Sequence, residues 1–194
     1  MKNACKYILT YILLALLFIC VPSTTRAQRW SVSTNALQWA TLGTINAEGG
    51  YSLNQNFSLS AGFAVNPWLV NSPTSIQMRN NQFGGYCGVK YWPWHVYSEW
   101  WFGAKIQYKQ FEQVGILTSN LVKGDAIGAG LSAGYSFMLG NHFNLDLGVG
   151  VWGGKIVNYA KYKGNTTVDS KLLEQGSKGF VFLDNLILSI IYIF

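Results

Sequence analysis

The stretch FNLDLGVGVW, residues 143–152, decides the fold. Its odd positions, from Phe143 to Val151, are all apolar, whereas the even positions up to Gly150 are Asn, Asp, Gly and Gly. A period of two places successive side chains on opposite faces of a β-strand. The stretch therefore predicts a strand with one apolar face.

The same alternation recurs along the chain. It is clear in residues 57–66, 99–109 and 127–139, where the second face consists mostly of the small residues Gly, Ala and Ser and of polar residues. It is weaker in four further segments, residues 29–35, 44–53, 83–92 and 180–194. Together with residues 143–152, these segments predict eight strands.

The links between the strands alternate in length. Tight turns are predicted at residues 53–56, 93–96 and 140–142, and long links at 68–82, 112–123 and 153–179, with 36–43 on the long-link side. An even-numbered barrel that crosses a membrane requires this alternation of short turns and long loops. We therefore predict an all-β fold, an eight-stranded antiparallel up-and-down transmembrane β-barrel over residues 28–194.

The composition agrees with a membrane barrel. Of the 194 residues, 49% are apolar and only 11% are charged, against about 25% charged residues in ordinary soluble domains. The alternative is a soluble barrel or sandwich, whose apolar face would point inward. Its outer face would need many Lys and Glu residues, but the non-apolar face here is Gly, Ser and Asn with few charges.

The N-terminal segment reads as an export signal. Lys2 and Lys6 precede an apolar run over residues 7–21, and a polar stretch ends at Ala27. We predict a signal peptide over residues 1–27, cleaved before Gln28. The alternative is a lipoprotein signal that uses Cys20.

Removal of residues 1–27 changes the charge and the thiol content. It takes away three of the 14 basic residues and leaves 11 against 8 acidic residues, a net charge of +3. This small positive net charge does not indicate a nucleic-acid partner. Cys87 becomes the only cysteine, so no disulfide can form within the mature chain.

The last predicted strand ends in Phe194. Counting back from it, the outward set is Tyr192, Ile190, Leu188 and Leu186, while Ser189 and Asn185 point inward. Asp184 breaks the outward set, and its distance from the chain end predicts a place at the outer interface. A terminal Phe resembles the signal that the outer-membrane insertion machinery reads, which makes that machinery an expected partner.

Aromatic residues gather near predicted strand ends. The turn-side ends carry Tyr51, Phe57, Tyr91, Trp100, Phe137, Phe143, Tyr192 and Phe194, and the loop-side ends carry Trp68, Trp152 and Phe180. Amphipathic rings favour the headgroup level of a bilayer, so this placement predicts two aromatic girdles. For any one aromatic residue, packing is the alternative explanation.

Charged residues are also predicted inside the barrel. The inward set is Glu48, Lys90, Glu99, Lys105, Lys109 and Asp146. Eight strands enclose a space only wide enough for side chains, so these charges should pair and plug the lumen. The alternative is a narrow gated channel. Gly128, Gly130 and Gly134 are predicted to make room for the Trp101 indole.

No catalytic, cofactor or metal site emerges from the sequence. The two histidines, His95 and His142, fall in tight turns. These turns are predicted at the periplasmic end of the barrel, away from the outer leaflet where a lipid-modifying barrel would act. No Ser-His-acid set can be assembled there, so we predict that the protein is not an enzyme. A lipid-modifying outer-membrane enzyme remains the alternative from another class.

The long link over residues 153–179 carries five lysines against Asp169 and Glu174. It could serve as a binding loop, and its candidate contact residues, together with one from an earlier loop, are Trp68, Tyr159, Lys161, Tyr162 and Lys163. The alternative is a solvated loop that meets outer-membrane lipid and anionic lipopolysaccharide.

Three short motifs carry a family resemblance. They are Thr34-Asn35-Ala36-Leu37, Glu48-Gly49-Gly50-Tyr51-Ser52-Leu53 and Asn66-Pro67-Trp68. The chain resembles an uncharacterised domain-of-unknown-function family of Bacteroidetes outer-membrane barrels, and the Ala27-Gln28 junction is similar to cleavage sites of that phylum. Ala36 stands where the family usually has a bulky aliphatic residue.

The resemblance carries functional implications as well. Members of that family are often encoded near fimbrial genes, which implies a structural or surface-interaction role and a fimbrial or other surface protein as partner. The family has no agreed catalytic residues to transfer to this sequence.

Overall fold

The computed structural model describes residues 29–40, 43–66, 69–70, 78–114, 120–163 and 171–194. The predicted signal peptide, residues 1–27, lies outside the described residues. The elements are β1 (Trp30–Asn35), α2 (Ala36–Ala40), β2 (Ile45–Ser52), β3 (Phe57–Asn66), β4 (Leu69–Val70), β5 (Met78–Tyr91), β6 (Glu99–Val114), β7 (Leu121–Met138), β8 (Phe143–Tyr162) and β9 (Leu172–Ile193).

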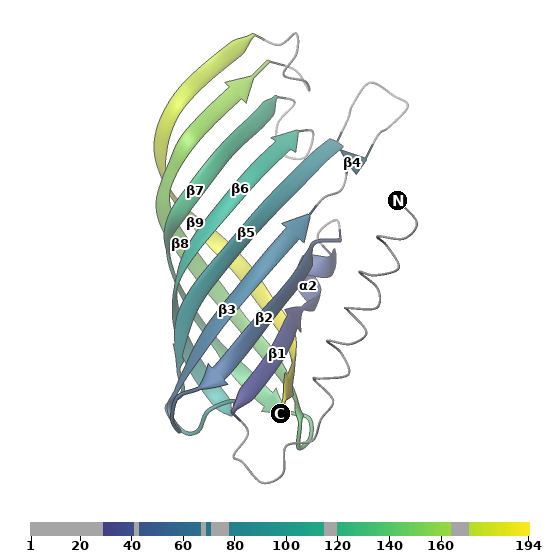
Figure 1. Cartoon of the computed structure of the whole chain (residues 1–194), viewed down its shortest axis with the longest axis vertical. Helices are drawn as coiled ribbons and strands as arrows, with labels where there is room; N and C mark the ends of the chain where they lie inside the picture. Colours follow the sequence, from purple (N-terminus) through teal and green to yellow (C-terminus); the bar gives the residue numbers. More distant parts are fainter. Residues whose placement is uncertain (1–28, 41–42, 67–68, 71–77, 115–119, 164–170) are drawn as a thin grey trace, which may run out of the picture.

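The strands form one antiparallel sheet in the order β3-β2-β1-β9-β8-β7-β6-β5-β4, and pairing of β3 with β5 closes eight of them into a barrel (Figure 1). The two-residue β4 is an extra strand that pairs only with the far end of β5. The predicted all-β, eight-stranded antiparallel barrel is confirmed. The predicted turns at residues 53–56, 93–96 and 140–142 all lie at one end, which we call the closed end.

The barrel wall is much taller on one side. The strands β1, β2 and β3 have 6, 8 and 10 residues, whereas β7, β8 and β9 have 18, 20 and 22. In Figure 1 the upper ends of β5 to β9 rise above β1 to β3 and above the short helix α2. We call these two sides the tall wall (β5–β9) and the low wall (β1–β3).

Three of the predicted long links are shorter than expected, because the strands of the tall wall extend into them. Residues 68–82, 112–123 and 153–179 were expected to be loops, but β5 begins at Met78, β6 reaches Val114, and β8 and β9 stay paired from Ile156 to Tyr162. In the tips of β8 and β9, residues 157–162 and 172–178, the side chains on both faces are exposed or half-buried. No face is then selected to be apolar, so the alternation fades while the backbone pairing continues.

The two faces of the barrel wall differ as predicted within the closed part. On β8, Asn144 and Asp146 are buried in the lumen, whereas Leu147 and Val149 are exposed on the outside. Among the described residues, no helix is long and apolar enough to cross a bilayer.

Aromatic rings form a belt around the outside of the closed end. Neighbouring rings touch from strand to strand, in the contacts Trp30–Tyr51, Phe57–Tyr91, Trp100–Tyr135, Tyr135–Phe137, Phe143–Tyr192 and Tyr192–Phe194. The expected turn-side placement is therefore confirmed. The loop-side placement is wrong for Trp152 and Phe180, which are buried and pack edge to face at 4.4 Å inside the tall wall. Trp68 lies outside the described residues.

A cluster of buried apolar side chains lies in the lumen at the closed end. Its members, which we call the closed-end cluster, are Trp92, Val96, Tyr97, Trp101, Ile191 and Ile193. The turn between β5 and β6 folds inward to supply Val96 and Tyr97. Asn144 donates a hydrogen bond to the backbone carbonyl of Tyr97 and so ties this turn to β8 across the lumen.

Gly134 makes room for the Trp101 indole, as predicted. A Cβ atom added at Gly134 would lie 2.6 Å from Cζ2 of Trp101. The same prediction is wrong for Gly128 and Gly130, since a Cβ there would first meet the backbone of β8, the Gly153 oxygen in the case of Gly128.

Candidate functional site

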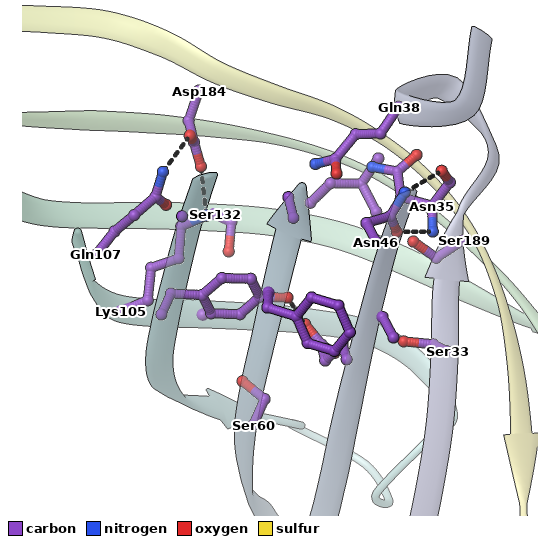
Figure 2. A pocket seen from close by; sticks show the side chains of 18 of the residues that line it. Ser33, Asn35, Gln38, Asn46, Ser60, Lys105, Gln107, Ser132, Asp184 and Ser189 are labelled. Atoms are coloured by element: carbon purple, nitrogen blue, oxygen red, sulfur yellow. Dashed lines mark hydrogen bonds and ion pairs between the residues drawn. The ribbon is translucent and has the colours of Figure 1, made fainter. Parts of the chain in front are cut away.

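Above the closed-end cluster the lumen holds a cavity of about 590 Å³. Its lining comes from β1, β2, β3, β5, β6, β7, β8 and β9 and from α2 at the rim. Figure 2 shows Ser, Asn and Gln side chains pointing into this space from several strands, with Gln38 of α2 at the upper edge. Because α2 residues line it, the cavity reaches the rim of the low wall.

The floor of the cavity holds one ion pair. Lys90 on β5 donates a hydrogen bond to Oε1 of Glu48 on β2 at 2.7 Å, and the Tyr86 hydroxyl donates to Oε2 of the same carboxylate. The Lys90 ammonium also lies 5.0 Å from the ring centre of Trp101. Both carboxylate oxygens of Glu48 therefore have partners, and Trp101 separates this layer from the closed end.

A second ion pair crosses the lumen higher up. Lys105 on β6 pairs with Asp184 on β9, and Gln107 Nε2 approaches the other carboxylate oxygen at 3.4 Å. Asp184 was expected at the outer interface, and this expectation is wrong. Gly150 pairs with Asn185 but Val151 pairs with Leu183, so β9 has an extra residue at this point. Such a β-bulge shifts the alternation and turns Asp184 into the barrel.

An asparagine network builds the rim of the low wall. The backbone N–H of Asn35 donates to Oδ1 of Asn46 at 2.7 Å, and Nδ2 of Asn46 donates back to the Asn35 carbonyl at 3.0 Å. Oδ1 of Asn35 accepts the N–H of Leu37 at 3.0 Å, which caps the start of α2. This network fixes the helix beside the cavity mouth.

The structure brings five of the six predicted lumen charges to the cavity lining: Glu48, Lys90, Lys105, Lys109 and Asp146. Only Glu48 and Lys90 pair with each other. Asp146 is 1% exposed and its Oδ1 has no hydrogen-bond partner among the described residues.

Glu99 does not belong to the lumen set. It is exposed at the closed end, where its backbone is left-handed with φ at 60°. The regular alternation of β6 therefore starts only after it. Sequence reasoning missed Asp184, because a bulge leaves no clear mark in a period-two pattern.

Residues 12–194 match the family described as protein of unknown function (DUF3575). The chain belongs to the DUF3575 family. No curated protein and no solved structure is significantly similar to it.

In this DUF3575 protein, residues of two of the motifs behind the family resemblance lie in the low wall. Asn35 and Asn46 form the rim network, and Asn66, which is fully buried, donates a hydrogen bond to the Thr44 hydroxyl at 3.0 Å. The Glu48 of the second motif supplies the floor ion pair. The motifs thus carry polar residues that shape the cavity.

Three of the candidate loop contacts of the DUF3575 protein lie on the strand β8, and a fourth directly follows it. Tyr159, Lys161 and Tyr162 belong to its upper end, and Lys163 follows directly and is exposed. Across the hairpin, Lys178 pairs with Glu174 at 2.5 Å and covers the Tyr159 ring at 4.5 Å. The fifth candidate, Trp68, lies outside the described residues.

Both histidines of the DUF3575 protein lie at the closed end. Nδ1 of His95 lies 3.0 Å from the Val96 carbonyl oxygen, and Nδ1 of His142 lies 2.9 Å from that of Ile193. Among the described residues, no group of three His, Cys, Asp or Glu side chains could hold a metal ion.

Proposed function

We propose that this protein is an integral outer-membrane β-barrel with its closed end toward the periplasm, and that it serves a structural or surface-interaction role at the cell exterior. The observation that carries the proposal is the closed barrel whose outer face is apolar and whose closed end is ringed by touching aromatic side chains. In the closed part of the wall each strand is paired on both edges, as a bilayer demands, and aromatic belts favour the headgroup level.

The low wall fits a bilayer with the help of α2. The strand β1 has only 6 residues, fewer than the about 9–11 that cross a bilayer at a tilt. Directly after it, α2 exposes Trp39, whose Nε1 donates a hydrogen bond to the Thr34 hydroxyl at 2.8 Å. The Asn35 side chain caps the first turn of α2, and the N–H groups of Gly43 and Thr44 donate to the Trp39 and Gln38 carbonyls, so α2 can continue the apolar band above β1.

The chain end fits the proposed route into the membrane. Phe194 donates its backbone N–H to the Trp30 carbonyl at 2.9 Å, and its ring packs against Tyr192 at 4.8 Å. It therefore lies at the seam where β9 meets β1. This supports a role for the last strand as the segment that the insertion machinery receives.

The upper hairpin of β8 and β9 is the part we propose to meet a surface partner. In this orientation it projects from the membrane and presents Tyr159, Lys161, Tyr162 and Lys163. Clustered basic and aromatic side chains favour contact with a protein, of which a fimbrial subunit is our first candidate, and with the anionic lipopolysaccharide around the barrel.

Neither conduction nor catalysis is part of the proposal. Trp92 and Trp101 are each 0% exposed and lie in the lumen at the closed end. The histidines lie at that same end, far along the strands from the outer leaflet where lipid chemistry would take place.

The location is tested by cell fractionation and by gel migration with and without heating. We expect the protein in the outer-membrane fraction, with a folded form that migrates differently from the heated form. Recovery of the mature protein as a soluble periplasmic species would overturn the proposed location.

The surface role is tested by shortening the upper hairpin. Ile156 and Lys178 are paired, so replacing residues 157–177 with a two-residue Asn-Gly turn should keep the barrel closed below them. We expect cross-linking in cells to recover a surface protein with the full-length chain and not with the shortened one. The pair Lys161→Gln and Lys163→Gln should weaken that cross-link, whereas Lys155→Gln serves as the matched loss of charge. An unchanged set of cross-linked partners would remove the hairpin from the proposal.

A further inference from the structure

One cation in the cavity has no counter-charge in contact with it. Lys109 on β6 lines the cavity beside Gln107 and Lys105. The charge of Lys105 is already paired with Asp184, whereas Lys109 makes no hydrogen bond or ion pair within the described part of the chain. The upper part of the cavity therefore presents one positive charge that is available to a ligand.

Two buried oxygen atoms along the cavity lack donors. Oε1 of Gln107 and Oδ1 of Asp146 are buried and accept no hydrogen bond among the described residues. Nε2 of Gln107 is directed at Asp184, so the amide oxygen is left on its other side (Figure 2). A buried acceptor without a donor destabilises the protein, because its hydrogen bond to water is not replaced. A hydroxyl group of a ligand would supply the missing hydrogen bond.

The rest of the lining has the chemistry of a site for a hydroxyl-rich molecule. Amide and hydroxyl side chains enter the cavity from five strands, namely Ser33, Asn46, Ser60, Ser132 and Ser189 (Figure 2). The aromatic rings of Trp101 and Tyr86 also contribute to the lining. Such groups exchange hydrogen bonds with hydroxyls and pack against the apolar face of a sugar ring, whereas an acyl chain would leave the polar groups without partners.

The cavity is a dead end of suitable size. Its volume of about 590 Å³ falls within the range of about 300–1,000 Å³ that small-molecule sites occupy. The closed-end cluster lies below it, and α2 lies at its rim. A molecule would enter and leave on the same side, as in a binding site.

We propose that the cavity binds a small hydroxyl-rich anion, a sugar acid or a sugar phosphate, with its anionic group at Lys109 and one of its hydroxyls at Gln107. The anionic group then lies at the upper end of the cavity, and the hydroxyl groups reach toward the floor. The same chemistry is offered by a free sugar acid and by the charged sugars of lipopolysaccharide, and the two sources are separated below.

The test uses the folded full barrel in detergent micelles and isothermal titration calorimetry. The probes are glucuronate and glucose 1-phosphate, with glucose as the neutral analogue and glutamate as an anion without hydroxyls. We expect the two anionic sugars to bind at least about tenfold more tightly than glucose, because a charge-assisted hydrogen bond is lost with the neutral sugar. Glutamate should not bind measurably.

Variants then locate the bound molecule. Lys109→Gln should weaken binding of glucuronate about tenfold or more and bring it close to that of glucose, whereas Lys109→Arg should retain the preference for the anion. Gln107→Leu should weaken the anionic sugars and glucose alike. Lys155→Gln removes a lysine that is exposed on β8 and does not line the cavity, so it should change nothing.

Heat-dependent gel migration identifies the variants that fold, and only these are titrated. If Lys109→Gln does not fold, the comparison of glucuronate with glucose on the wild-type protein and on Lys109→Arg decides the proposal. Equal affinity for glucuronate and glucose, binding of glutamate, or no binding of any probe would overturn it.

A competition experiment separates the two sources. Purified lipopolysaccharide that displaces glucuronate indicates a lipid-borne ligand, and failure to displace it indicates a free molecule. Both results support the cavity as an anionic-sugar site. A loss of glucuronate binding in Lys155→Gln equal to that in Lys109→Gln would place the effect outside the cavity and overturn the assignment.

Discussion

Lys105 on β6 pairs across the lumen with Asp184, the residue that a β-bulge turns inward on β9. The two strands are not neighbours in the barrel, since β7 and β8 lie between them. The pair therefore ties together opposite parts of the wall. Because the side chains are 14% and 5% exposed, loss of one partner leaves the other charge largely buried.

Asp184→Leu should destabilise the barrel by about 3–5 kcal/mol, the usual cost of leaving one charge of a buried pair without its partner. The double variant Lys105→Met, Asp184→Leu should recover most of this loss, since both charges of the pair are removed together. Urea unfolding of the protein in lipid vesicles measures both. A small effect of Asp184→Leu alone would mean that Asp184 faces outward, as the unbroken alternation implied.

A comparison of Leu147 with Leu172 tests where the proposed membrane band ends. Both are exposed on the outside, Leu147 at 41% and Leu172 at 44%. In the proposed orientation Leu147 faces acyl chains and Leu172 faces water. Leu147→Arg should cost about 2–4 kcal/mol near the bilayer midplane, whereas Leu172→Arg should cost less than about 1 kcal/mol.

Folding into lipid vesicles, followed by unfolding in denaturant, measures this difference. Leu147→Ala controls for the loss of the leucine side chain and should cost less than Leu147→Arg. If arginine were tolerated equally well at both positions, the outer face of the barrel would not be in contact with lipid.

Gly134 is one of the glycines against which the Trp101 indole packs. A Cβ there would lie 2.3 Å from the Leu147 carbonyl oxygen and 2.6 Å from the Trp101 ring. Gly134→Ala should therefore destabilise the barrel by about 1–3 kcal/mol through overpacking. Gly140, where a Cβ would meet nothing within 4 Å, is the matched control, and Gly140→Ala should stay within about 0.5 kcal/mol. Equal unfolding midpoints for the two variants would contradict this packing.

The barrel could be predicted from the sequence where one face of a strand is selected against the other. Residues 143–152 lie between an apolar exterior and a polar lumen, so every second side chain is constrained. The same strand continues to Tyr162, where the side chains on both faces are exposed or half-buried and nothing enforces alternation. The predicted loop at residues 153–179 was wrong for this reason.

The candidate site was harder to predict, because it depends on register. Glu48 and Lys90 could be placed inward from the alternation alone, and they pair. The bulge at Asp184 changes the face of a single residue and cannot be read from a period of two. The cavity itself depends on α2 and the Asn35–Asn46 network, which set the height of the low wall.

The last prediction concerns the closed end, where the lumen narrows around Trp92 and Trp101. Both indoles are 0% exposed, and their ring centres lie 6.4 Å apart. Val96 and Tyr97 from the turn join them in the same buried cluster, and we expect these side chains to exclude a hydrated ion. The reconstituted wild-type protein should therefore show no steady conductance in planar lipid bilayers.

The double variant Trp92→Ala, Trp101→Ala removes the two largest side chains of the closed-end cluster and should produce measurable openings, provided that its gel migration shows a folded barrel. Gly140→Ala, on the outside of the same end, should stay silent. Stable openings of the wild-type protein would show that the closed-end cluster does not seal the lumen, and the cavity above it would then be part of a path through the membrane.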